Sequence, residues 1–219
     1  MRLALLSLAM LAAPLAAAEP PSAAVQALVE AYEAKRQKGE ELVVELAAMA
    51  ARDQFVRFVF IEAMAQAKTE DDRKAFIAAA VGRMNAVDLA NTKRLQEILA
   101  TTSWSELASL SRQAVENAQL IVSHSSDEAF QARMLREFEP LVKTGVISGE
   151  AYALLFDDVA INQGRKQRYG TNFDCIDGKN APQPLEDPDR VEAWRKEVGL
   201  KPLAEYTREI IELYGACPS

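Results

Sequence analysis

The sequence is poor in the residues on which most recognisable catalytic and metal sites depend. It has one histidine and two cysteines among 219 residues, which excludes a site built from several histidines and a cysteine pair at zinc spacing. It also lacks a glycine-rich phosphate loop, a His-Glu-x-x-His helix and a Gly-x-Ser-x-Gly elbow. The sequence therefore predicts no metal site, and it identifies neither a reaction nor a cofactor.

Long uncharged apolar runs are also missing after the N-terminus. A membrane-spanning helix needs about twenty such residues, and the strongest candidate, residues 55–65, carries Arg57 and Glu62. Residues 1–18, in contrast, place one positive charge before an apolar stretch that ends in three alanines, the pattern of a signal peptide. We expect cleavage at the end of this segment and a periplasmic or secreted protein that is soluble and leaves the membrane. An uncleaved anchor is the alternative, which Pro14 disfavours.

The charge balance is acidic, with a formal net charge of −7 for the whole chain. Removal of the signal peptide takes away only Arg2, which leaves 24 Lys and Arg against 32 Asp and Glu, a net charge of −8. An acidic surface repels phosphate backbones and anionic lipids. We therefore expect no nucleic-acid partner, and the partner is an unknown small molecule or protein.

The two cysteines, Cys175 and Cys217, both lie near the C-terminal end. In an oxidising compartment such a pair usually forms a disulfide. Closing a loop of this length stabilises the fold by about 4 kcal/mol in the chain-entropy model. We predict a disulfide; the alternatives are two free thiols or a metal pair, which no neighbouring His or Cys supports.

The spacing of apolar residues and of helix caps predicts a mainly α-helical fold. Gly39 is expected to end the first helix, Gly82 to break a later one and Pro140 to kink or stop the helix that begins near Asp127. Helices are expected over residues 23–38, 40–68, 69–100, 103–122, 127–140, 148–163, 188–198 and 202–214. After Gly164 turn-forming residues accumulate, and Asp177-Gly178 predicts the turn of a small loop or hairpin.

These elements indicate a helical bundle with a small loop or β-hairpin appendage after Gly164. About two hundred residues suit one domain with a sizeable core. We interpret residues 19–39 as an N-terminal lead and helix, and residues 40–219 as a single helical domain.

Several polar residues interrupt apolar helix faces. Asp157 has apolar neighbours three and four positions away on either side; burying an unpaired carboxylate costs several kcal/mol, so it needs a partner or a shifted pKa. A solvated helix edge is an equally acceptable interpretation. Asp53 and Arg57 are spaced to pair on one helix, as an ordinary surface ion pair would be. Asp88 and Asn91 share a face and alone would be unremarkable.

His124 follows an apolar run near the expected end of a helix. The spacing favours a capping role, in which the ring hydrogen-bonds to terminal carbonyls or interacts with the helix dipole. The functional alternative is a general base oriented by Asp127 or by a distant carboxylate. A compact polar loop is formed by Gln167, Tyr169, Gly170 and Thr171. Such a loop can line a pocket, or it can simply connect two elements.

Together these short sequence motifs resemble those of a bacterial domain family of unknown function. The resemblance rests on the order and spacing of a set of blocks over roughly residues 40–206: Asp53-Gln54-x-x-Arg57, Asp88-x-x-Asn91-x-x-x-Leu95, Trp104, His124 with Phe130-Gln131, Asp157, and Gly164-x-x-Gln167-x-Tyr169-Gly170-Thr171. The chain departs from the family pattern at several positions: Ser103 and Ser105 replace Gly and Pro around Trp104, Asp158 replaces Arg, Asn172 replaces Gln, and Ser123 replaces Gln. The change at position 158 removes the most obvious charge partner of Asp157.

We hypothesise that these polar side chains converge on one pocket. In a hydrolase-like site His124 would be the general base, Asp88 or Asp157 would orient it or hold a cation, and Arg57 would stabilise negative charge. The remaining candidates would bind the ligand: Asp53, Gln54, Asn91, Gln131, Gln167, Tyr169 and Thr171. The alternatives are a non-catalytic binding or interaction module, or a family copy that has lost its activity.

Overall fold

The computed structural model describes residues 22–176, 178–214 and 217, except for the side chains at 64, 65, 213 and 214. The expected signal peptide, residues 1–18, lies outside these residues. The chain divides into two compact units, residues 1–38 and 39–219. In the first unit the described part, from residue 23 onward, is helical and solvent-exposed. The second unit contains the core and the candidate site.

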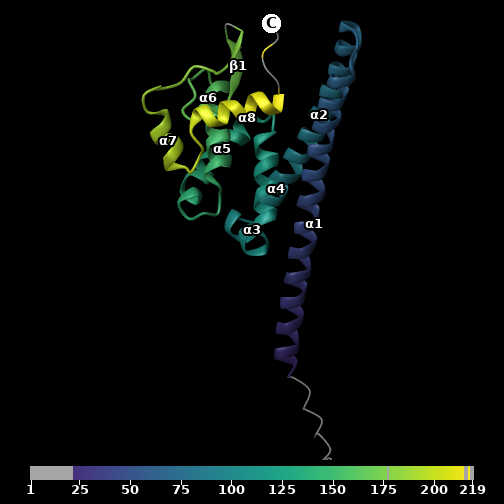
Figure 1. Ribbon diagram of the computed structural model, residues 1–219. Coiled ribbons are helices and arrows are strands. Elements are labelled where there is room, and N and C mark those ends of the chain that lie inside the picture. Colours follow the sequence, from purple (N-terminus) through teal and green to yellow (C-terminus); the bar gives the residue numbers. More distant parts are fainter. Residues whose placement is uncertain (1–21, 177, 215–216, 218–219) are drawn as a thin grey trace, which may run out of the picture. The chain divides into compact units, whose positions relative to one another are not determined.

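The described residues form helices and one small sheet (Figure 1). The helices are α1 (Ala23–Gln66), α2 (Glu70–Leu99), α3 (Trp104–Leu110), α4 (Arg112–Ser123), α5 (Glu128–Lys143), α6 (Gly149–Asn162), α7 (Val191–Glu197) and α8 (Leu203–Tyr214). Strands β1 (Phe173–Ile176) and β2 (Lys179–Pro182) pair antiparallel, with Phe173 opposite Pro182 and Ile176 opposite Lys179. The predicted mainly α-helical class with a hairpin after Gly164 is confirmed.

Local capping chemistry sets the beginnings of several helices where the sequence predicts them. The Ser103 side chain accepts a hydrogen bond from the Glu106 amide at 3.2 Å, and the Glu106 carboxylate accepts one from the Ser103 amide at 2.8 Å. Thr69 and Ser148 cap α2 and α6 in the same way through their hydroxyl groups. Gly164 follows the end of α6 with a φ of +69°, a conformation that glycine adopts without strain.

Two predicted helix interruptions are wrong. Neither Gly39 nor Gly82 breaks its helix, because one glycine costs only about 1 kcal/mol in a long helix. Gly39 serves packing instead: a Cβ atom there would lie 2.6 Å from Cδ2 of Leu110, so its missing side chain lets α3 approach. Pro140 likewise does not stop α5, which continues to Lys143.

One helix break was not predicted. The segment 103–122 was expected to be a single helix, but Ser111 is extended, with φ −167° and ψ 135°, and separates α3 from α4. Serine favours the position before a helix, although the Ser111 side chain makes no capping hydrogen bond to α4. The break turns the chain between two short helices that both pack into the core.

The main core joins α1 through α6. Its centre includes Leu46, Leu95, Leu107, Phe130 and Phe138, each 2 % exposed or less. Burying side chains of this size contributes roughly 1.5–3 kcal/mol each. A smaller cluster of Ala153, Tyr169 and Trp194 packs α7 and the loop after α6 against α6.

The predicted disulfide is confirmed: Cys175 of β1 and Cys217 are bonded, with their Cα atoms 5.7 Å apart. The bond ties residue 217 to the hairpin. Among the helices of the described part of the chain, none has a stretch long and apolar enough to cross a membrane.

Candidate functional site

The only histidine is held by a buried carboxylate. Asp53 of α1 is 1 % exposed, and its Oδ1 and Oδ2 atoms lie 3.0 and 2.8 Å from Nδ1 of His124. His124 is the residue that ends α4, and its backbone amide donates to the Leu120 carbonyl. The ring does not hydrogen-bond to the terminal carbonyls as predicted; it reaches a carboxylate 71 positions away in the sequence, and only the backbone amide of His124 bonds to the end of α4. The orienting carboxylate is distant, and it is not Asp127, whose side chain caps α5.

Arg57 links this pair to the neighbouring helix. Its Nη1 atom donates to Oδ1 of Asp53 at 2.9 Å, and its Nη2 atom lies 3.0 Å from both carboxylate oxygens of Asp88 on α2. The Arg57 side chain is 19 % exposed, so this is a partly buried network rather than the surface ion pair that the local spacing suggested. The network fixes α1, α2 and the end of α4 around one carboxylate.

The environment keeps Asp53 ionised. Burial alone would raise its pKa, but hydrogen bonding and charge from His124, together with Arg57 and Gln54, outweigh burial and place the pKa below its usual value. An ionised carboxylate accepts only, so the neutral imidazole carries its proton on Nδ1. The lone pair then lies on Nε2. For Asp88 the balance is the opposite: burial raises its pKa despite the contact with Arg57.

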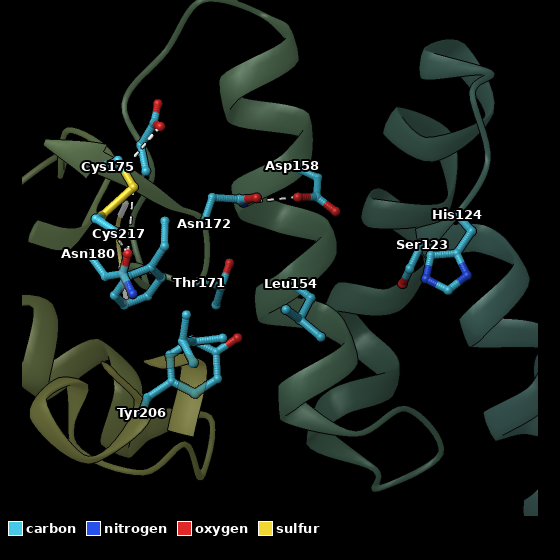
Figure 2. Close-up of a pocket in the computed structure, with 13 residues that line it drawn as sticks. Ser123, His124, Leu154, Asp158, Thr171, Asn172, Cys175, Asn180, Tyr206 and Cys217 are labelled. Carbon is cyan, nitrogen blue, oxygen red and sulfur yellow. Dashed lines mark hydrogen bonds between the residues drawn. A yellow bond between two sulfur atoms is a disulfide. The ribbon is translucent and has the colours of Figure 1, made fainter. Parts of the chain in front are cut away.

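A cavity of about 570 Å³ has His124 in its wall (Figure 2). The wall is formed by the end of α4, one face of α6, the hairpin and α8, with Cys175 and Cys217 at its edge. The lining residues are Ser123, His124, Leu154, Asp158, Thr171, Asn172, Phe173, Asp174, Cys175, Asn180, Tyr206, Ile210 and Cys217. Because Nδ1 of His124 is engaged by Asp53, Nε2 is the ring nitrogen that remains for a ligand in this cavity.

Asp158 is a further ionisable group in the cavity wall, and its position there was not predicted from the sequence. Its Oδ1 accepts a hydrogen bond from Nδ2 of Asn172 at 2.9 Å, as Figure 2 shows. Burial raises its pKa, and the neighbouring Asp157 charge adds to that effect. The sequence feature that could have indicated this role is its position next to Asp157. Two adjacent carboxylates on a helix point in different directions, so Asp158 had to face a different part of the structure from Asp157.

Asp157 does not reach the cavity; it organises the loop after α6. The carboxylate is fully buried and accepts hydrogen bonds from the backbone amides of Arg168 at 2.7 Å, Tyr169 at 3.0 Å and Thr171 at 3.0 Å. The Thr171 hydroxyl adds a fourth donor at 2.9 Å. The partner that a buried Asp157 required is therefore a set of backbone amides, not an arginine.

Gln167 closes the same loop from its other end. Its Nε2 atom donates to the carbonyls of Asn172 and Gln183 at 2.9 and 2.7 Å, and its Oε1 atom accepts from the Asn172 amide at 2.9 Å. Tyr169 packs edge-on against Phe156 with ring centroids 5.5 Å apart, and burial raises its pKa to about 12. Of this loop only Thr171 and Asn172 line the cavity.

Two further candidates join helices, and a third supports Asp53 within α1. Asn91 donates to the Met49 carbonyl at 3.2 Å and joins α2 to α1. Gln131 donates to the carbonyls of Val122 and Ser123 at 3.2 and 3.1 Å, which joins α5 to the end of α4 just before His124. Gln54 donates to Oδ2 of Asp53 at 2.9 Å.

Apart from Asn91 and Gln131, the predicted residues divide into two networks. The first surrounds Asp53 and contains Gln54, Arg57, Asp88 and His124. The second surrounds the loop after α6 and contains Asp157, Gln167, Tyr169 and Thr171. The cavity lies where both end, with His124 from the first and Thr171 from the second in its wall. Within the described residues no three His, Cys, Asp or Glu side chains are grouped to hold a metal ion.

Comparison with known proteins gives the family but not an activity. No curated protein and no solved structure is significantly similar to the chain. The model of a family described as a family of unknown function, DUF6624, matches residues 40–217. This match includes both polar networks and the cavity, and the chain belongs to that family.

Proposed function

We propose that the domain takes a small molecule into the 570 Å³ cavity and hydrolyses it there, with His124 as the general base. The observation that carries this proposal is the hydrogen bond of 2.8 Å between Nδ1 of His124 and the buried Asp53 carboxylate, in the wall of that cavity. A volume of this size lies in the usual range for small-molecule sites. The protein would act after export, in the periplasm or outside the cell.

The proposed step is a proton transfer to Nε2 of His124. A water molecule bound between the imidazole and the substrate gives its proton to Nε2 as its oxygen attacks the electrophilic carbon. The imidazolium that forms is stabilised by the ionised Asp53 behind it, and the proton then passes to the leaving group. Asp53 is thus a positioning residue for the base.

The roles first considered for Arg57, Asp88 and Asp157 change in this proposal. None of the three lines the cavity, so they do not contact a substrate bound there. Arg57 holds Asp53 in place and is itself held by Asp88 at 3.0 Å. Asp157 fixes the loop that carries Thr171 into the cavity wall.

We expect the purified protein to hydrolyse at least one class in a panel of nitrophenyl esters, nitroanilides and nitrophenyl glycosides. For that class, His124→Ala should lower kcat/KM about 10²–10⁴-fold, because the base is lost. Asp53→Asn should lower kcat by a similar factor, since an amide places the imidazole proton on the wrong nitrogen. Ser109→Ala is the matched control, because Ser109 is exposed and outside the cavity.

The tautomer can be measured without a substrate. His124 is the only histidine, so an untagged, ¹⁵N-labelled protein gives one pair of imidazole nitrogen signals. We expect the neutral ring to show its proton on Nδ1 and to lose that preference in Asp53→Asn. A proton on Nε2 in the unmodified protein would contradict the assigned base.

A second candidate function is self-association. It is favoured by exposed apolar residues on the end of α1 (residues 55–66) and the beginning of α2 (residues 70–83), here called the segment. On α1, Phe55, Phe58 and Ile61 are 65 %, 64 % and 54 % exposed, and on α2 Phe76 is 43 % exposed. A crevice of about 230 Å³ lies between the two helices, lined almost entirely by apolar side chains. Exposed patches of this kind mark interaction surfaces.

The occupant that fits this segment is the same segment of a second copy. Two helices alone cannot enclose a core, whereas two such pairs form a four-helix layer. Two helices of this length and width offer a face of about 500 Å² per copy, or about 1,000 Å² in total, which is at the lower limit for a specific interface. The association would therefore be reversible.

Light scattering should detect a dimer whose mass falls to that of the monomer on dilution. Phe55→Ser combined with Phe58→Ser should give a monomer at all concentrations, because it removes the two most exposed aromatic rings of the segment. Val44→Ser is the control, since Val44 is 69 % exposed but lies on α1 outside the segment. A monomeric unmodified protein at about 100 μM would rule out this candidate.

A further inference from the structure

Apart from His124, the charged side chains that line the cavity in the described part of the chain are carboxylates. Asp158 and Asp174 contribute carboxylates, and the described residues that line the cavity include no lysine or arginine. The nearby cations are engaged elsewhere: Arg57 with Asp53 and Asp88, and Arg195 with the carbonyls of Tyr169 and Lys201. A ligand with a phosphate or carboxylate group would meet repulsion in this cavity and no compensating cation.

One carboxylate oxygen of Asp158 remains able to accept a hydrogen bond from a ligand. Asn172 donates to its Oδ1, and no described residue donates a hydrogen bond to its Oδ2. Burial and the adjacent Asp157 both raise the pKa of Asp158, which means that its negative charge lacks full compensation in the protein. A cation placed against this carboxylate supplies the missing charge partner.

Other residues of the wall are apolar or aromatic. Phe173 of β1 and Tyr206 of α8 are in edge-to-face contact, with ring centroids 5.8 Å apart. Leu154 and Ile210 lie in the same wall. One face of Tyr206 is covered by the Arg195 guanidinium, 5.0 Å from the ring centroid, so a ligand packs against Phe173 and the aliphatic groups. The cavity therefore combines one underused carboxylate with an apolar surface.

We infer that the ligand of this cavity carries a protonated amine, which Asp158 binds, attached to an apolar or aromatic group. This inference deepens the proposed function, since it names the chemical class of the molecule on which His124 acts. Asp158 supplies charge recognition and His124 supplies the base, so the two residues have separable roles. Replacing Asp158 and replacing His124 should therefore give different experimental results.

Three probes that share one ring and differ in charge test this inference: benzylamine, benzyl alcohol and benzoate. Binding is followed by two-dimensional NMR of the full chain, and resonances of cavity residues should shift. We expect benzylamine to bind at least about tenfold more tightly than benzyl alcohol and benzoate not to bind measurably. Asp158→Asn should abolish the preference for benzylamine, whereas Asp189→Asn, an exposed carboxylate outside the cavity, should leave it intact.

The outcomes separate this inference from the proposed hydrolysis. Benzylamine binding should persist in His124→Ala, because the amine is bound by Asp158, while hydrolysis is lost. A selective amine site in a protein that hydrolyses nothing would support the ligand class and overturn the general-base role. Equal or tighter binding of benzoate, no shift of cavity resonances with any probe, or an unchanged preference in a folded Asp158→Asn protein would each overturn the inference.

Discussion

Asp157→Asn is expected to lower the free energy of unfolding by about 3–5 kcal/mol. The Asp157 carboxylate is fully buried and accepts from three backbone amides and one hydroxyl. An asparagine keeps one acceptor oxygen and places an NH₂ group against the remaining N–H donors, so several buried donors lose their partner. For a domain of this size the melting temperature should fall by roughly 10 °C. Urea unfolding followed by circular dichroism measures the change.

The neighbouring residue provides a control of the same chemistry. Asp158→Asn replaces a partly exposed carboxylate that has a single hydrogen bond, to Asn172, and should change stability by less than about 1 kcal/mol. Similar losses in the two variants would contradict the assignment of Asp157 as the organiser of the loop. In that event the position of Thr171 in the cavity wall would need another cause.

Asp158 and Asn172 contact each other at 2.9 Å in the wall of the cavity. Asp157 does not need an arginine beside it, because the loop amides satisfy its charge. The contact between Asp158 and Asn172 therefore belongs to the cavity wall, whereas Asp157 is a separate, buried acceptor for the loop amides.

The features predicted correctly from the sequence are those with local causes. The capping pair Ser103 and Glu106 and the glycine that follows α6, Gly164, depend on residues only a few positions apart. Such local patterns can be recognised in the sequence. The hairpin and the disulfide follow from a turn dipeptide and a cysteine pair. Gly39 was misjudged because it packs against Leu110 of α3, which is distant in the sequence. The break at Ser111 was missed because no side-chain cap marks it.

The candidate site was predicted only in part, because its contacts span long sequence distances. Asp53 lies 71 positions from His124, and Arg57 lies 31 positions from Asp88. Spacing within one helix shows that Asp53 and Arg57 can pair, but it cannot show that a third and a fourth group join them. Residue types also do not reveal which of Asp157 and Asp158 faces inward, since the two lie about 100° apart around the axis and the rotation of α6 is set by packing against other elements.

Asp53→Asn is expected to destabilise the fold by about 3 kcal/mol at pH 7, the second large effect. The variant leaves His124 without its carboxylate and Arg57 with one carboxylate, Asp88, and the backbone carbonyl of residue 53. The folded-state pKa of Asp53 lies below its ordinary value of 3.8. Its contribution to stability is therefore fully present above the unfolded pKa and is lost as the pH falls through the lower, folded value.

The free energy of unfolding is measured at pH 7 and at about pH 3. The difference between the unmodified protein and Asp53→Asn should be large at pH 7 and smaller at pH 3. Asp189→Asn, an exposed carboxylate, should change stability by less than about 0.5 kcal/mol at either pH. An Asp53→Asn protein as stable as the original at pH 7 would mean that the carboxylate is not committed to Arg57 and His124. Because the same contact fixes the proton on Nδ1, that result would also remove the physical basis for His124 acting as a base.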